Sequence, residues 1–188
     1  PLQVITAVTY RFDGQGYLKP GYDKIFVVPA EGGAPRQLTF GHYHDRGPLS
    51  WSPDGRTIYF SANRSPEWER DTNESEVYAL DVAGGAVTAL TRRDGPDEQP
   101  IVSPDGSRIA YVGYDDRRLG YHNSILYVMD RDGSDPRALT ASLDRSVESP
   151  VWADDGRSLY VSYDEAGETR VARVGLDGSV RTVAEGLS

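Results

Sequence analysis

The stretch Trp51-Ser52-Pro53-Asp54-Gly55 decides the fold, because it returns twice further along the chain. It recurs as Val102-Ser103-Pro104-Asp105-Gly106 and, with substitutions, as Trp152-Ala153-Asp154-Asp155-Gly156. The Asp-Gly pairs begin at 54, 105 and 155, so they lie 51 and 50 residues apart. Self-similarity at a period of this length indicates a repeat architecture. Trp51 and Trp152 hold the same position of the repeat, and both are therefore predicted to be core residues.

A second marker, Leu-Thr, follows each unit at Leu38-Thr39, Leu90-Thr91 and Leu139-Thr140. Two short apolar runs lie between the markers, as at 58–60 and 77–80. Ser-Pro-Asp-Gly has turn chemistry, because Pro fixes φ, Asp bonds to the local backbone and Gly adopts positive φ. Gly84-Gly85 and its counterparts mark a second hairpin turn. Each unit therefore predicts four short strands.

Four strands per unit at this period indicate an all-β chain built from β-propeller blades. The units occupy 1–40, 47–91, 97–140 and 147–184, and the first supplies strands two to four without its Ser-Pro-Asp-Gly strand. Propellers typically close with about four to eight blades. We interpret residues 1–188 as a β-propeller fragment of about four four-stranded antiparallel blades, the first incomplete. A four-bladed ring closed by a non-standard strand is the alternative.

Composition excludes several classes of function. The chain has 20 Lys+Arg and 29 Asp+Glu, a net charge of −9, and no cysteine. Without cysteine there are no disulfides, thiolate nucleophiles or Cys-built metal sites. The acidic balance argues against nucleic acid, and no apolar run approaches the roughly 20 residues of a membrane span. Pro1-Leu2-Gln3 has no signal-peptide features, so the expected location is cytoplasmic.

Because successive strands run in opposite directions, the loops that connect them lie at two opposite ends of the blades. The tight-turn rim carries the Ser-Pro-Asp-Gly turns and the turns between strands three and four. The long-loop rim carries 11–23, 41–47, 61–76, 92–99, 113–123 and 141–149. Functional loops on a rigid scaffold tend to be long, so we expect binding on this second rim. In loop 61–76, Ser65-Pro66-Glu67 predicts one helical turn, and Trp68 fits either a core position or a binding platform.

Side chains on the long-loop rim are the candidates for lining a substrate entrance: Arg11, Asp13, Tyr17, Arg70 and Arg145. The stretch 11–17 combines an arginine, an acid and two aromatic rings, and an arginine can hold a peptide carboxylate through two parallel hydrogen bonds. The competing interpretation is a structural loop whose arginine pairs with an acid. No catalytic residue is predicted, because the chain has neither a Gly-x-Ser-x-Gly elbow nor a phosphate loop.

Two patterns suggest metal binding, and both have a simpler interpretation. His42 and His44 are one residue apart in a connector, but no further ligands are evident in the other units, so we favour a solvated connector. The stretch 130–135 is similar to the start of a calcium loop, but it lacks the bidentate Glu and coincides with the hairpin turns of the other units. We predict neither a metal nor a cofactor.

The unit from 51 to 91, with WSPDGRTIYFSAN and SEVYALDVAGGAVTALT, resembles the TolB-type propeller repeat. That repeat occurs in TolB, tricorn-like proteases, some sugar lyases and the prolyl oligopeptidase family of serine peptidases. Two stretches are similar to the propeller of acylaminoacyl peptidases: VITAVTYRFDGQGYLKPGYDKIFVVPAEGGAPRQLT at 4–39 and ALTASLDRSVESPVWADDGRSLYV at 138–161. The resemblance implies a propeller that covers a C-terminal α/β-hydrolase domain with a Ser-Asp-His triad. That domain is absent from this chain, so no catalytic residue carries over.

The predicted function is substrate gating in a serine peptidase similar to acylaminoacyl peptidases, which hydrolyses short peptides. The expected partners are the hydrolase domain of the parent chain, a peptide substrate and a second copy meeting the open blade edges, with no nucleic acid and no membrane. The alternative is a TolB-like propeller that acts as a protein-binding module. A metal-dependent lyase is a third class, and it would need His42 or His44 as a ligand.

Overall fold

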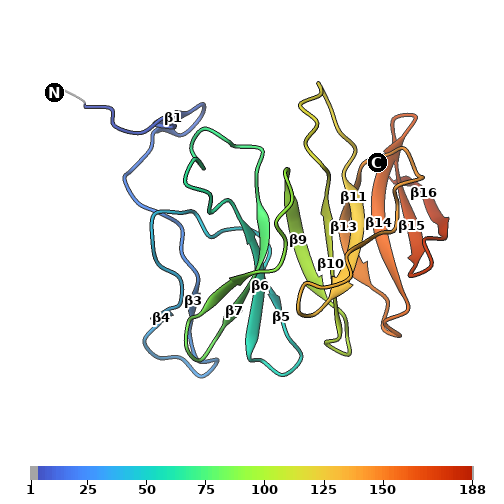
Figure 1. Ribbon diagram of the computed structural model, residues 1–188, viewed down its shortest axis with the longest axis horizontal. Helices are drawn as coiled ribbons and strands as arrows, with labels where there is room; N and C mark the ends of the chain where they lie inside the picture. The colour runs from blue at the N-terminus through green and yellow to red at the C-terminus, as the bar shows by residue number, and fades with distance from the viewer. Residues whose placement is uncertain (1–3, 188) are drawn as a thin grey trace.

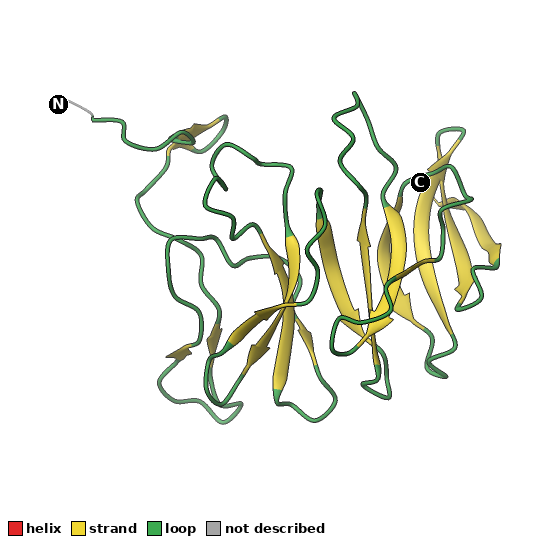
Figure 2. Cartoon of the chain, in the orientation of Figure 1, coloured by secondary structure: helices red, strands yellow, loops and turns green. Residues whose placement is uncertain are grey.

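The computed structural model describes residues 4–187, and there it contains strands and loops but no helix (Figure 2). One four-stranded sheet contains β5 (Ser50–Trp51), β6 (Thr57–Ala62), β7 (Glu76–Asp81) and β8 (Val87–Ala89). A second contains β9 (Asp97–Val102), β10 (Arg108–Gly113), β11 (Ile125–Asp130) and β12 (Arg137–Ala138). A third contains β13 (Val147–Trp152), β14 (Ser158–Glu165), β15 (Glu168–Gly175) and β16 (Val180–Leu187).

In each of these sheets the strands lie side by side in chain order, and every neighbouring pair is antiparallel. The three sheets stand face to face, and the chain passes from one to the next along a single direction (Figure 1). The arrangement is that of consecutive blades, each made of one meander of four strands.

The first unit differs from its predicted three strands. Only β3 (Phe26–Val27) and β4 (Arg36–Gln37) pair in this unit, while β1 (Arg11–Phe12) and β2 (Gly16–Tyr17) form a separate hairpin. Residues 4–10 are not assigned to any strand. Among residues 4–187 this unit has no inner strand, so a strand two paired with β3 would leave its other side unpaired, as an exposed sheet edge.

The recurring turn is held by local hydrogen bonds that explain its sequence. The Ser52 hydroxyl donates to Asp54 Oδ1 at 2.6 Å and accepts the Thr57 N–H at 2.9 Å. Ser103 and Asp105 repeat the first contact at 2.6 Å. Gly55 has a φ of 68°, in the left-handed region that favours glycine. The turn therefore depends on its own few residues. Where Ala153 replaces the serine, the hydroxyl contacts are lost, but the Gly156 N–H still donates to the Ala153 carbonyl at 2.9 Å, as Gly55 does to Ser52.

The Leu-Thr marker also has a structural role. In the first three units the Thr Oγ1 accepts the N–H of a residue at or near the start of strand three. The distance is 2.9 Å for Thr39 and Ile25, for Thr91 and Val77, and for Thr140 and Leu126. The preceding Leu N–H donates to the carbonyl of the same strand-three residue at 2.8 Å, for Leu38, Leu90 and Leu139. These bonds align equivalent positions of the repeat residue by residue.

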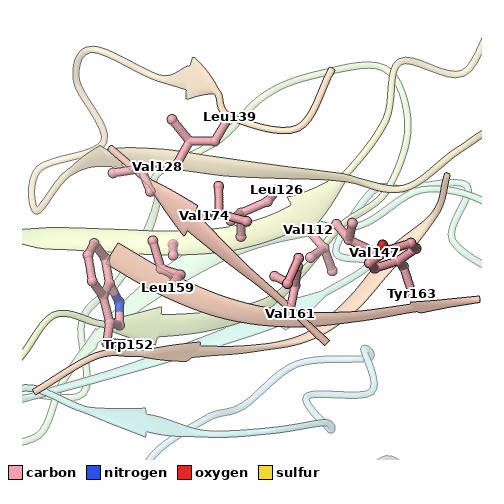
Figure 3. Close-up of a cluster of buried hydrophobic side chains, with 12 residues drawn as sticks. Val112, Leu126, Val128, Leu139, Val147, Trp152, Leu159, Val161, Tyr163 and Val174 are labelled. Atoms are coloured by element: carbon pink, nitrogen blue, oxygen red, sulfur yellow. The ribbon is translucent and has the colours of Figure 1, made fainter. Parts of the chain in front are cut away.

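The core lies between the sheets. Figure 3 shows the cluster between the second and third sheets, where Leu126 and Val128 meet Leu159 and Val174. Trp152 belongs to this cluster, and its Nε1 donates to the Ile101 carbonyl of the preceding sheet at 3.2 Å. The prediction of a core position is confirmed for Trp152.

The same prediction is wrong for Trp51. Its side chain is 47% exposed, whereas that of Trp152 is 9% exposed. Trp152 packs against an inner strand of the sheet before it, and the unit before Trp51 has no such strand among the described residues. Burial at this position therefore depends on the neighbouring blade and not on the repeat alone.

Candidate functional site

The long loops gather at one end of the sheets. Figure 1 shows the β1–β2 hairpin, the loop between β6 and β7, the loop between β10 and β11 and the β14–β15 turn at the same end. The Ser-Pro-Asp-Gly turns lie at the opposite end. This long-loop rim is the surface on which the sequence predicts binding, and its features are described from the N-terminal unit onward.

The hairpin carries three of the predicted entrance residues. Arg11 pairs with Tyr17 across the two strands, and Asp13 lies in the turn between them. All three are exposed. The hairpin stands away from the sheets (Figure 1), and the Val8 N–H donates to Glu69 Oε2 of the β6–β7 loop at 3.1 Å. The structure thus places Arg11, Asp13 and Tyr17 together on an arm beside that loop.

Arg70 lies in the β6–β7 loop that anchors the arm. Its Nη1 donates to Glu67 Oε2 at 2.7 Å, and the guanidinium is 73% exposed. No helix is assigned at the predicted helical turn, but residues 66–70 form consecutive turns. The Trp68 N–H donates to the Ser65 carbonyl at 3.3 Å and the Asp71 N–H donates to the Glu67 carbonyl at 2.9 Å, which is the spacing of a single helical turn. Arg70 remains accessible, since a surface ion pair of this kind holds a side chain weakly.

Arg145 is separated from the other four candidates. It lies between β12 and β13, at the far end of the stack from the hairpin (Figure 1). Its Nη2 donates to Glu165 Oε1 at 3.1 Å, and Arg170 binds the other oxygen of the same carboxylate. Arg145 is therefore part of an ion network within the last blade, which matches the competing structural interpretation of these arginines.

Sequence analysis missed a cluster of aromatic rings from three loops. Tyr22 stacks on His42 with ring centroids 5.5 Å apart. His44 lies 5.4 Å from both Tyr22 and Trp68. The sequence signals were the His42-Tyr43-His44 pattern and Trp68, which fitted either a core position or a binding platform, but no periodicity connects them with each other or with Tyr22. Tyr22 is 42% exposed, so the cluster offers ring surface to a ligand or partner.

His44 takes part in polar contacts in addition to this stacking. Its Nδ1 lies 2.9 Å from Asp23 Oδ2, and Arg46 lies 3.5 Å from the same oxygen. Among residues 4–187, no group of three or more His, Asp and Glu side chains is placed to hold a metal ion. The stretch 130–135 makes a turn, with the Gly133 N–H donating to the Asp130 carbonyl at 2.9 Å.

Beneath the rim lie two buried carboxylates, of which Asp45 joins the first unit to the second. Asp45 accepts from Lys24 Nζ at 3.0 Å and from Arg64 Nε at 2.7 Å, and its own side chain is fully buried. Asp97 is bound by Arg93, whose guanidinium lies 4.1 Å from the centre of the Tyr127 ring. Each carboxylate joins a connector to residues of a strand or loop beside it.

A small polar pocket opens between the first and second four-stranded sheets. Its volume is about 160 Å³, and it is lined by Thr72, Asn73, Glu74, Ser75, Pro96, Glu98, Val112, Gly113, Tyr114 and Ser124. Burial raises the pKa of Glu74, which accepts the Gly95 N–H at 3.1 Å. Tyr114 and Asn73 are hydrogen-bonded at 2.8 Å across the two sheets. The pocket is large enough for a few-atom polar group and belongs to the rim.

Glu76 makes stability depend on pH. Burial raises its pKa from 4.5 to about 7, against a hydrogen bond from Thr91, and the charges of Asp97 and Glu74 raise it further. The folded state therefore holds this proton more tightly than the unfolded state. The contribution of Glu76 to stability is complete below about pH 4.5 and is lost as pH rises through about 7.

Glu76→Gln is accordingly expected to stabilise the fold at pH 8 by about 1 kcal/mol, a value reduced for solvent screening, and to change little at pH 4. Gln keeps a group that can accept from Thr91 while it removes the charge. Urea unfolding of both proteins between pH 4 and 8 measures the difference. Glu98→Gln, on the exposed start of β9, is the matched control, and an equal pH-dependent gain there would contradict the assignment.

The chain matches the TolB beta propeller domain family over residues 15–186. It is 27% identical over 165 residues to dipeptidyl-peptidase 5 of Arthroderma otae, covering 81% of this chain and 22% of that protein. Among solved structures it resembles a puromycin-hydrolyzing peptidase of Mycobacterium tuberculosis, with a TM-score of 0.64 and 23% identity over 87% of this chain and 29% of that one. TolB from Acinetobacter baumannii gives a TM-score of 0.64 and 19% identity over 86% of this chain and 37% of that one.

The stacked antiparallel sheets and these matches define the molecule as an all-β propeller, as predicted, with an incomplete first blade. The chain belongs to the TolB beta propeller domain family. It spans 47% of a relative from Agrobacterium fabrum and 22% of the dipeptidyl-peptidase relative. In the part of the chain that the structure describes, no helix is long and apolar enough to cross a membrane.

Proposed function

We propose that this chain is the substrate-gating part of a serine peptidase of the prolyl oligopeptidase family, similar to acylaminoacyl peptidases and acting on short peptides. The propeller restricts which peptides reach a C-terminal α/β-hydrolase domain of the same polypeptide. The chain supplies binding and exclusion but no catalytic residue. The cytoplasm remains its expected location.

The observation that carries this proposal is the 27% identity to dipeptidyl-peptidase 5 over 165 residues. The match to the TolB beta propeller domain family covers residues 15–186 of the chain. The arm with Arg11, Asp13 and Tyr17 adds support, because it offers a free cation, an acid and a ring at the rim where long loops gather. A peptide has complementary groups: a terminal carboxylate, a terminal ammonium and apolar side chains. The side chains of the arm suit gating, since they can bind the ends of a peptide but have no group that cleaves it.

Active-site labelling tests the proposal. A fluorophosphonate should label the full polypeptide that carries this chain, and that polypeptide should cleave short peptide anilides. The 188-residue chain alone should do neither. A full polypeptide that neither reacts with the probe nor cleaves any free or N-acetylated peptide would overturn the proposal.

Arg11→Ala in the full polypeptide is expected to raise KM about 10-fold for peptides with a free carboxylate, the loss of one charged hydrogen bond. kcat should change little, because Arg11 lies on the arm and not beside the reacting bond. Steady-state kinetics with free and amidated peptides measure both constants. Arg157→Ala, on the tight-turn rim, is the control, and wild-type kinetics for Arg11→Ala would contradict its role at the entrance.

A TolB-like protein-binding module is the second candidate. The exposed ring cluster of Tyr22, His42, His44 and Trp68 favours it, since aromatic surface is typical of binding sites for proteins. A binding module would show no reactive serine in the full polypeptide. The labelling experiment therefore separates the two candidates.

A further inference from the structure

Two positions beneath the long-loop rim can be compared in successive units, because the hydrogen bonds of the repeat align them. The first is the residue directly before the N–H that the threonine of the Leu-Thr marker accepts, namely Lys24, Glu76 and Ile125. The second is the residue whose N–H donates to the carbonyl just before the first position, namely Asp45, Asp97 and Val147. The two positions are therefore neighbours in each of three junctions.

The first and third of these pairs suit a buried environment. Lys24 and Asp45 form an ion pair of 3.0 Å. Ile125 and Val147 are both apolar, and Val147 is fully buried. A buried charge is tolerated when an opposite charge meets it, and a hydrocarbon side chain needs no partner. The fold therefore accepts either an ion pair or two apolar side chains at these positions.

The middle pair is different, because Glu76 and Asp97 are both acids. Arg93 binds Asp97 Oδ1, and the Thr91 hydroxyl donates its one proton to Glu76 Oε2. Thr91 also lies beside Asp97 but has no second proton to give. Asp97 Oδ2 is thus buried without a hydrogen-bond partner among residues 4–187, on a side chain that is 1% exposed. A buried carboxylate oxygen of this kind needs a cation or a proton beside it.

The first junction shows which group binds at the equivalent oxygen. Asp45 directs one oxygen to Arg64 Nε at 2.7 Å and the other to Lys24 Nζ at 3.0 Å. Asp97 likewise directs one oxygen to an arginine, but among the described residues no ammonium group meets its other oxygen. The first junction thus has two cations for one buried acid, and the middle junction has one cation for two acids.

We propose that a monovalent cation of about the size of an ammonium ion binds between Glu76 and Asp97, in the position equivalent to that of Lys24 Nζ. One positive charge balances the middle junction, where two carboxylates share one guanidinium. Carboxylate oxygens are the ligands that hard cations prefer. A divalent ion is disfavoured, because within residues 4–187 no group of three acidic or histidine side chains is placed to hold a metal. Glu76 is half-buried, so the ion can enter from the rim.

A proton competes with the cation for this position. Burial raises the pKa of Glu76 to about 7 and that of Asp97 to about 6; the charges of Glu74 and Asp115 raise them further, while Arg93 lowers both. Below these values a proton on either carboxyl group reduces the negative charge of the pair. Above about pH 7 both groups are ionised, and the cation then supplies the missing charge. Cation binding should therefore stabilise the fold at pH 8 and lose its effect at pH 5.

Urea unfolding of the chain at pH 8 tests the proposal with potassium ion, which is close to ammonium in size. The folded-to-unfolded ratio should be about ten-fold higher in about 150 mM KCl than in choline chloride of equal concentration, as mass action gives for a Kd of about 15 mM. Choline has the same charge but is too large to fit between the two side chains. At pH 5 the two salts should give equal ratios. Equal ratios at pH 8 would overturn the proposal.

Three variants separate this site from a general effect of salt. Glu76→Lys gives the middle junction the ammonium group of the first, so its stability should not differ between KCl and choline chloride. Glu76→Gln removes one of the two charges and should also abolish the difference, which keeps the test decisive if Glu76→Lys does not fold. Glu98→Gln, on the exposed start of β9, is the matched control and should keep the difference. A difference that persists in Glu76→Gln, or that disappears in Glu98→Gln, would also overturn the proposal.

Discussion

Asp45→Ala is expected to lower the free energy of unfolding by about 3–5 kcal/mol, because it leaves two buried cations without their shared counter-charge. The Asp45 side chain is 0% exposed, and Lys24 and Arg64 are only 9% and 15% exposed. Each cation loses hydration on burial, and Asp45 supplies the only opposite charge that the two share, beside neutral contacts such as that of Lys24 Nζ with the Tyr43 carbonyl. The effect should be larger than that of any single ion pair on the surface of this chain.

Urea unfolding at pH 7 measures this loss, and Asp23→Ala is its matched control. Asp23 lies beside the same cluster and pairs with His44 and Arg46, but its side chain is 56% exposed. Its removal should cost less than about 1 kcal/mol. Asp45→Asn keeps the shape of the side chain and removes the charge, so it should also destabilise strongly. Similar small losses for Asp45→Ala and Asp23→Ala would show that the ion cluster is hydrated.

The features predicted from sequence are those that local chemistry determines. The Ser-Pro-Asp-Gly turn closes through hydrogen bonds among residues 52–57, and the Leu-Thr marker binds a strand of its own unit. A short recurring pattern contains all the atoms of such contacts, so the strands, their order and the two rims follow from it. The segment 11–23 was predicted as a loop on the long-loop rim, and the β1–β2 hairpin that it contains lies there, although the hairpin itself was not predicted.

The features that sequence analysis missed are produced by neighbours. The cluster of Tyr22, His44 and Trp68 unites three loops, and no spacing predicts which loops will meet. Asp45 is a charged residue in a connector, where a solvated position is the usual expectation, and only the cations from two other segments allow its burial. The first unit pairs two strands where three were predicted, and among residues 4–187 no inner strand lies beside them.

Trp51 and Trp152 make this dependence on neighbours measurable, since one residue type holds one repeat position in two environments. Trp152→Ala is expected to cost about 3–5 kcal/mol, because it empties a volume within the cluster of Figure 3. It also leaves the Ile101 carbonyl without the 3.2 Å hydrogen bond from Nε1. Trp51→Ala is expected to cost about 1 kcal/mol or less, because its ring is already 47% exposed.

Both substitutions are made singly in the otherwise unchanged chain, in which Trp51 is exposed and Trp152 is buried. Urea unfolding then compares the two losses at equal protein concentration. Equal losses would contradict the assignment of Trp152 to the blade junction. The difference between the two losses therefore measures how much of the role of a core tryptophan comes from the adjoining blade.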